Sequence, residues 1–110
     1  MKRSSAKRKG KKLQSLIRNK ILETFEHLRP EDVRVAGIGE NGADVKLSAV
    51  AKKLFPYEVE CKNQEKFRTL YKFWRQTERH GKLEPVLIVK MNSEQPLAIV
   101  DLDHFFDLVK

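Results

Sequence analysis

The stretch Tyr57–Lys62 constrains the fold most, because uncharged and charged residues alternate along its whole length. In a β-strand this alternation places Glu58, Glu60 and Lys62 on one face and the uncharged residues on the other. The uncharged face can join a core, whereas the charged face must border solvent or a polar site. Solvated strand faces often carry alternating charges, so this pattern alone does not define a site.

An acidic residue lies upstream of the alternating stretch, Asp44 in Gly42-Ala43-Asp44, and could form a metal site with it. If Asp44 and Glu60 lie on adjacent strands, their carboxylates can together hold a hard cation such as Mg²⁺, with Mn²⁺ as a substitute. Lys62 can then orient the attacking water or stabilise charge that develops on a phosphate. The pattern predicts metal-assisted hydrolysis of a phosphodiester bond.

The positive charge is concentrated near the start of the chain. Of 23 Lys and Arg residues, seven fall in the first twelve positions, where there is no acid: Lys2, Arg3, Lys7, Arg8, Lys9, Lys11 and Lys12. The remaining chain is nearly neutral. We expect residues 1–9 to be a disordered basic tail that binds a polyanion, most simply DNA, and residues 10–110 to form one domain. A solubilising tail and a membrane-surface helix are the alternatives.

Apolar periodicity and turn signals predict an α/β sandwich with a mixed sheet. We expect helices at about 11–28, 64–80 and 103–109, a helical turn at 48–53, and strands at 32–36, 43–47, 57–62, 85–90 and 97–100. Asn41-Gly42 predicts a hairpin between the first two strands. Phe67, Leu70, Tyr71 and Trp74 should face the core from the second helix, the apolar run Val86–Val89 should be covered on both faces, and Asp103 should cap the last helix.

Several single residues have open interpretations. Gln14 lies on the apolar stripe of the first helix and is either a boundary residue or a helper whose amide reaches a metal-bound water or the phosphate. Arg34 and Lys46 are candidate phosphate contacts. Cys61 is the only cysteine and should be a buried thiol, which excludes an intrachain disulfide. No apolar run is long enough for a membrane span, so we expect an intracellular, cytoplasmic protein.

The motifs, taken in order, resemble the PD-(D/E)XK nuclease superfamily, in particular its Holliday junction resolvase-like branch and the small phage proteins of that type. Four segments carry the resemblance: Gly10–Gln14 opening the first helix, Arg34–Gly39 in the hairpin, Gly42–Asp44 on the second strand and Glu60–Lys62 on the third.

The resemblance implies a restriction-endonuclease-like αβββαβ core and a Mg²⁺-dependent homodimeric endonuclease that cuts branched DNA. The resemblance to small phage proteins includes the alternative of a phage-encoded enzyme that acts in the host cell. It assigns Asp44, Glu60 and the Cys61 carbonyl as metal ligands and Lys62 as the residue acting on the attacking water. Gln14 stands where this branch commonly has Glu, which leaves the number of metal ions open. A non-catalytic DNA-binding module, and the same chemistry on linear or nicked DNA, are the alternative functions.

Overall fold

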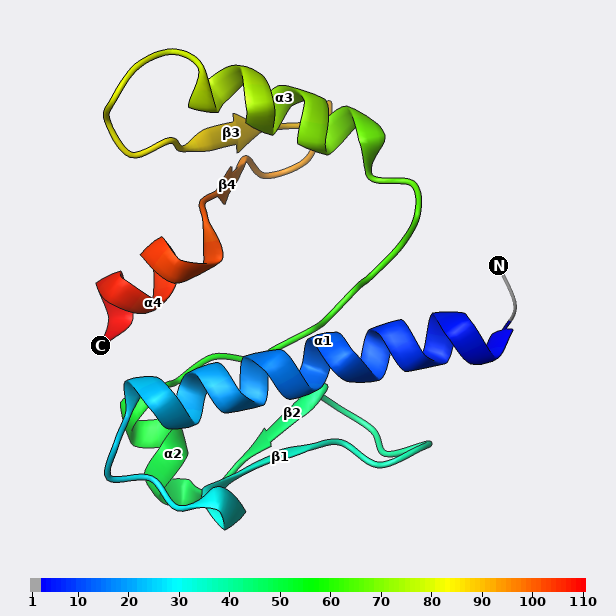
Figure 1. Cartoon of the computed structure of the whole chain (residues 1–110), viewed down its shortest axis with the longest axis vertical. Helices are drawn as coiled ribbons and strands as arrows, with labels where there is room; N and C mark the ends of the chain where they lie inside the picture. Colours follow the sequence, from blue (N-terminus) through cyan, green and yellow to red (C-terminus); the bar gives the residue numbers. More distant parts are fainter. Residues whose placement is uncertain (1–2) are drawn as a thin grey trace. The chain divides into compact units, whose positions relative to one another are not determined.

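The computed structural model describes residues 3–110, with side chains from residue 8 onward. Within these residues the fold is mixed α/β, with four α-helices, one short 3₁₀ helix and two small antiparallel sheets (Figure 1). None of the helices in this part of the chain is long and apolar enough to cross a bilayer. The chain divides into two compact units, each described by itself below. The N-terminal unit ends at Gln64 and includes Lys110, and the C-terminal unit spans Glu65–Val109.

The first helix, α1 (Arg3–Thr24), is longer at its start and shorter at its end than the sequence indicates. Residues 3–9, which we expected in a disordered tail, belong to this helix because Lys, Arg and Ala are strong helix formers. Gly10 lies inside α1, although glycine is a poor helix former, and the helix is continuous through it. The helix ends at Thr24, whose hydroxyl donates a hydrogen bond to the Lys20 carbonyl at 2.7 Å.

The predicted hairpin is confirmed and carries the core of the N-terminal unit. Strand β1 (Val33–Val35) pairs antiparallel with β2 (Val45–Leu47), with Val35 opposite Val45. α1 packs against this hairpin. The buried side chains of the unit are Ile17, Ile21, Leu28, Val33, Val45, Ala51 and Phe55. Burying each of the larger ones contributes about 1.5–3 kcal/mol, so this cluster fixes the hairpin beneath the helix.

Asp32 and Ser48 fasten the two ends of the hairpin. The 3₁₀ helix η1 (Pro30–Asp32) leads into β1, and the Asp32 carboxylate accepts hydrogen bonds from the Ser48 hydroxyl at 2.7 Å and the Arg29 N–H at 2.8 Å. These bonds, the Arg29 N–H first, lower the pKa of Asp32. Ser48 also accepts the Ala51 N–H and so caps α2 (Ala49–Leu54), the predicted helical turn.

The predicted third strand does not form as a regular strand. Tyr57–Lys62 is an extended segment, and the sheets of the described chain are two separate two-stranded pairs instead of one mixed sheet. The reason lies at Asp44. Its carbonyl faces the hairpin, where it accepts the Ala36 N–H, so the Cys61 N–H on the other side bonds the Asp44 side chain and a regular backbone ladder is not built.

The C-terminal unit contains α3 (Arg68–Glu78), β3 (Leu87–Val89), β4 (Leu97–Ile99) and α4 (Leu102–Val109). β3 and β4 form an antiparallel pair with Ile88 opposite Ala98. The predicted cap of α4 was wrong by two residues. Asp101, and not Asp103, accepts the His104 N–H at 3.2 Å, because it lies three residues before that exposed N–H.

The apolar residues of the C-terminal unit are less buried than predicted. No residue of α3 is buried, and the stripe residue Tyr71 is 53% exposed. The run around β3 was expected to be covered on both faces, but Ile88 is 61% exposed. Two short helices and a two-stranded sheet enclose too little volume to bury both faces of the sheet and the whole stripe of α3.

Candidate functional site

Asp44 holds both peptide groups that flank Glu60. Its backbone N–H donates to the Val59 carbonyl at 2.8 Å, and its side-chain Oδ2 accepts the Cys61 N–H at 2.8 Å. Glu60 lies between those two peptide groups and is therefore held opposite Asp44. The two carboxylates predicted to share a cation come from neighbouring segments that run side by side.

The chain on either side of these bonds is well anchored. Asp44 directly precedes β2, whose first residue Val45 is buried, and it follows Gly42, which has a φ of +93° that favours glycine. The other segment starts at the buried Phe55, whose ring contacts Phe25 and Tyr57 at centroid distances of 6.2 and 4.8 Å. Buried residues therefore anchor both segments: Val45 lies next to Asp44, and Phe55 lies five residues before Glu60.

Glu60 and Lys62 form an ion pair on the exposed side of the segment. Lys62 Nζ lies 3.2 Å from Glu60 Oε1, as expected for side chains two residues apart in an extended chain. Both side chains are more than half exposed, so the pair adds little stability and can be rearranged by a ligand.

Cys61, between these two residues, is only partly buried, although we expected a buried thiol. The Asp44 bond to its N–H keeps this part of the chain at the surface of the unit instead of in a sheet interior. Burial raises the pKa of the Cys61 thiol, and the nearby charges of Asp44 and Glu60 raise it further. The thiol is therefore held in its neutral form.

The predicted ligand set fits Mg²⁺ by its chemistry. Two carboxylates, a peptide carbonyl and a neutral amide are all oxygen donors, which hard cations prefer. Among residues 3–110 no three His, Cys, Asp or Glu side chains gather as a metal cluster. The predicted set contains only two carboxylates, so it relies on the Cys61 carbonyl, on Gln14 or on water for the remaining ligands.

Gln14 has an unsatisfied polar atom. Its Oε1 is buried and has no hydrogen-bond partner among the described residues. Gln14 lies one and two turns before Ile17 and Ile21, the buried residues through which α1 packs on the hairpin. A buried carbonyl oxygen without a partner costs about 1–3 kcal/mol, so an oxygen facing a cation or its water would be stabilised.

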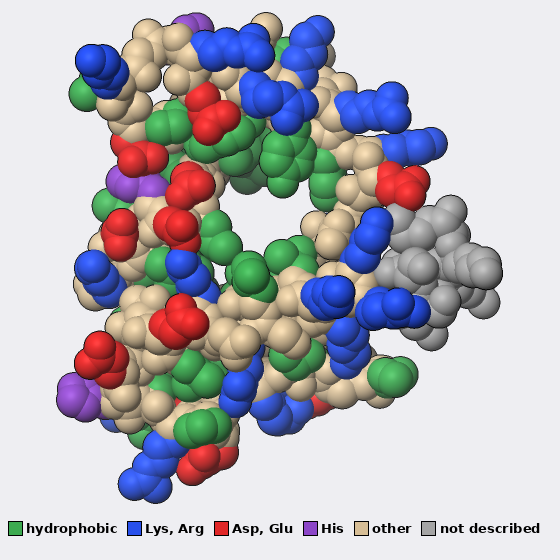
Figure 2. All heavy atoms as spheres, in the orientation of Figure 1, with side chains coloured by type: hydrophobic (Ala, Val, Ile, Leu, Met, Phe, Trp, Pro, Cys, Tyr) green, Lys and Arg blue, Asp and Glu red, His purple; other side chains and the backbone are tan. Residues whose placement is uncertain are grey.

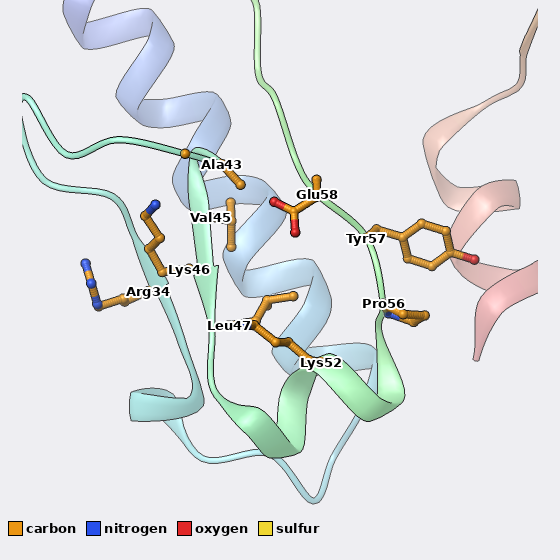
Figure 3. A pocket seen from close by; sticks show the side chains of 10 residues that line it. Arg34, Ala43, Val45, Lys46, Leu47, Lys52, Pro56, Tyr57 and Glu58 are labelled. Carbon is orange, nitrogen blue, oxygen red and sulfur yellow. The ribbon is translucent and has the colours of Figure 1, made fainter.

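Arg34 and Lys46, the predicted phosphate contacts, lie side by side on the hairpin. They face each other across β1 and β2 and line a pocket of about 550 Å³, together with Lys52, Tyr57 and Glu58 (Figure 3). Arg34 pairs with Glu40, and Lys46 donates a hydrogen bond to the Asn41 carbonyl. The pocket lies between the hairpin and the segment that carries Glu60.

The basic residues of α1 have different surroundings. Arg8, Lys9 and Lys12 are exposed, and Lys11 donates to the Ala36 carbonyl at 3.3 Å. The side chain of Lys7, also predicted to contact DNA, lies outside the described side chains. Figure 2 shows Lys and Arg side chains over the first half of α1 and others over α3. A basic surface therefore follows α1 toward the end of β1.

Sequence reasoning missed four residues of this region. Glu40 binds Arg34, whereas Lys52, Tyr57 and Glu58 line the pocket. The strand alternation placed Glu58 on the same face as Glu60 and so carried a signal for one of them. The role of Glu40 depends on how the glycine loop folds back onto β1, which no periodicity indicates.

Comparison with protein-family models, with curated proteins and with solved structures finds no match to this chain.

Proposed function

We propose that this chain is a Mg²⁺-dependent endodeoxyribonuclease of the PD-(D/E)XK type that acts on branched DNA, as a Holliday junction resolvase does. One observation carries the proposal: Asp44 bonds both peptide groups flanking Glu60. These bonds hold the backbone on both sides of Glu60 next to Asp44, and Lys62 pairs with Glu60. In our proposal the two carboxylates turn toward one cation from these adjacent positions, as metal-assisted phosphodiester hydrolysis requires.

Each residue of the site has a role in this proposal. Asp44 and Glu60 hold the cation together with the Cys61 carbonyl, and Gln14 supplies an amide oxygen to its water shell or to the phosphate. The cation supplies Lewis-acid chemistry at the scissile phosphate. Lys62 leaves its pair with Glu60 and donates a hydrogen bond to the attacking water or to the phosphate oxygen that gains charge.

The restriction-endonuclease-like αβββαβ core is part of the same proposal. The bond from the Asp44 N–H to the Val59 carbonyl is the kind of bond that a third strand beside β2 would make. The helix before the hairpin and the helix, two strands and helix after the segment follow the expected order. In this proposal Tyr57–Lys62 pairs fully with β2 when the cation and DNA bind.

DNA reaches the site along basic side chains. The proposed contacts on α1 are Arg8, Lys9, Lys11 and Lys12, and the proposal adds Lys7 from the sequence alone. Arg34 and Lys46 line the pocket between the hairpin and the segment that carries Glu60. Their contacts with phosphate position DNA without reading its sequence. We propose that a homodimer acts inside the cell, with one site for each of two strands.

The test is cleavage of a synthetic four-way junction by the purified protein, with linear and nicked duplexes of the same sequence beside it. Mg²⁺ or Mn²⁺ should support cleavage, and EDTA should abolish it while binding persists. Preference for the junction would establish the branched substrate, whereas equal cutting of all three would keep the chemistry and reject that selectivity. Absence of metal-dependent cleavage on every substrate would contradict the proposed chemistry.

A non-catalytic DNA-binding module is the second candidate. It is favoured by the exposed basic surface of α1, which does not depend on the carboxylates. This candidate predicts salt-sensitive binding, with a slope of about −0.9 per duplex phosphate contacted and no metal-dependent product. The cleavage assay separates the two candidates.

A further inference from the structure

The Glu40 carboxylate occupies a ready-made anion site. Arg34 Nη1 donates to its Oε1 at 2.9 Å and Arg34 Nη2 to its Oε2 at 2.7 Å, while the Gly37 N–H donates to Oε1 at 2.8 Å. A guanidinium fork supported by a backbone N–H is also the arrangement that binds a phosphate group. The hydrogen bonds from Arg34, followed by the one from Gly37, lower the pKa of Glu40 to about 2.

The two cations beside this site lie directly opposite each other across the hairpin. Arg34 is the cross-strand partner of Lys46, and like charges at such positions repel. The charge of Lys46 also acts on Glu40. An anion between β1 and the loop reduces this repulsion, and Glu40 supplies it in the free protein.

The loop that carries Glu40 is able to release it. Residues 37–42 are exposed, Ile38 is 94% exposed, and Gly39 has a φ of +77°. Arg34 is itself more than half exposed, so its pair with Glu40 is a surface ion pair that contributes little to stability. Replacing the Glu40 carboxylate by another anion at Arg34 therefore costs little free energy.

The site borders the pocket already described. Arg34, Lys46 and Lys52 line that pocket with a single carboxylate, Glu58 (Figure 3). A phosphate on Arg34 would lie at the hairpin side of this pocket, whose other side is formed by Pro56, Tyr57 and Glu58 of the segment that leads to Glu60. The position suits a backbone phosphate of DNA approaching the proposed catalytic residues.

We propose that Glu40 occupies, in the DNA-free protein, the position that a DNA phosphate takes on Arg34 and the Gly37 N–H, and that DNA binding displaces it. The inference rests on the proposed function for the identity of its ligand, which is DNA. It makes Glu40 an internal competitor that weakens binding of DNA, and it makes Arg34 a phosphate contact that becomes available only after Glu40 moves away.

The test measures binding of a fluorescent 20-base-pair duplex to full-length protein in EDTA, over a series of NaCl concentrations. Glu40→Gln should tighten binding about 5- to 10-fold and steepen the salt dependence by about one unit, because one more phosphate is contacted. Glu31→Gln, an exposed substitution in η1 with the same change in charge, is the matched control and should change binding less than about 2-fold.

The double variant Arg34→Gln/Glu40→Gln separates competition from a change in net charge. If Glu40 competes for Arg34, the gain of Glu40→Gln disappears in the double variant, and Arg34→Gln alone weakens binding only slightly. A gain no larger than that of Glu31→Gln, or one that persists without Arg34, would overturn the inference.

The outcomes for the inference and for the proposed function are distinguishable. DNA binding without any gain from Glu40→Gln rejects the inference and leaves the nuclease proposal intact. The expected gain in a protein that never cleaves DNA supports the inference and rejects the nuclease chemistry. Failure of every variant, and of the wild-type chain, to bind DNA rejects both.

Discussion

The two units of this chain each contain an antiparallel strand pair and helices, but they differ in how far they bury their apolar residues. In the N-terminal unit Ile21, Val33, Val45 and Phe55 are almost completely buried. In the C-terminal unit Ile88 is 61% and Leu97 63% exposed. A helix of 22 residues covers the first hairpin, whereas α3, half that length, packs against β3 without burying any of its own side chains.

Catalytic side chains need a rigid support, and a closed core provides it. Asp44 and Glu60, which we propose as metal ligands, lie in the unit with the closed core, and Asp44 directly precedes the buried Val45. The exposed apolar surface of the other unit carries none of the predicted catalytic residues. The predictions below test this difference, beginning with the largest effect.

The core of the N-terminal unit should be far more sensitive to truncation than the strands of the C-terminal unit. Phe55→Ala removes a buried ring and should lower the free energy of unfolding by about 3–5 kcal/mol. Ile88→Ala, at an exposed position of β3, should change it by less than about 0.5 kcal/mol. Urea titrations followed by circular dichroism measure both. Equal costs would mean that β3 is covered in solution.

Two substitutions of Asp44 should distinguish its structural role, as a hydrogen-bond acceptor, from its proposed role as a metal ligand. Asp44→Ala leaves the Cys61 N–H without its acceptor and should cost about 1–2 kcal/mol of stability. Asp44→Asn keeps a side-chain oxygen and should lose less than half of that, although both variants should lose metal-dependent cleavage. Thermal unfolding and the junction assay, run on the same preparations, check this. Retained activity in Asp44→Asn would remove Asp44 from the proposed ligands.

The hydrogen bonds of Ser48 at the end of the hairpin should contribute less to the free energy of unfolding. Ser48→Ala removes the cap of α2 and the hydroxyl bonded to Asp32, and should cost about 1 kcal/mol. Asp101→Ala removes the corresponding cap of α4 in the C-terminal unit and should cost less, because that helix packs less completely. Urea titrations of the two variants compare them, and a larger cost for Asp101→Ala would reverse the ranking of the units.

The smallest effect is the pH dependence of the Arg34–Glu40 pair. The pKa of Glu40 falls from 4.5 to about 2 on folding, so its stabilising contribution is complete above about pH 4.5 and is lost as the pH falls toward 2. The melting temperature of wild-type protein should therefore approach that of Glu40→Gln between pH 5 and pH 2.5. Asp32, whose pKa is also lowered, is present in both proteins and cancels. A constant difference would show that the pair is not formed in solution.

Local signals predicted much of the fold. Asn41-Gly42 predicted the hairpin, and alternating or continuous apolar runs predicted β3 and β4. The third strand was not predicted correctly, because Tyr57–Lys62 has the pattern of a strand yet makes one backbone bond and one side-chain bond to Asp44. Such a competition between a carbonyl and a carboxylate for one N–H is not encoded in periodicity.

Part of the candidate site could also be predicted from the sequence. Residue type and spacing indicated Asp44, Glu60 and Lys62, and residue type alone indicated Arg34 and Lys46, whose cross-strand pairing the structure adds. Glu40 could not be found in this way, because its partners depend on the path of an exposed glycine loop. Burial in the C-terminal unit was overestimated because an apolar pattern shows what a segment can bury, and not what covers it.

The most direct test of the proposed site compares Glu60→Gln with Glu58→Gln. These residues are two positions apart on the same segment, and the substitutions make the same change in charge. With a four-way junction and Mg²⁺ under single-turnover conditions, Glu60→Gln should slow cleavage more than about 100-fold while binding in EDTA is unchanged, and Glu58→Gln should cleave within a few-fold of wild type. Cleavage by Glu60→Gln at the wild-type rate would contradict the proposed site.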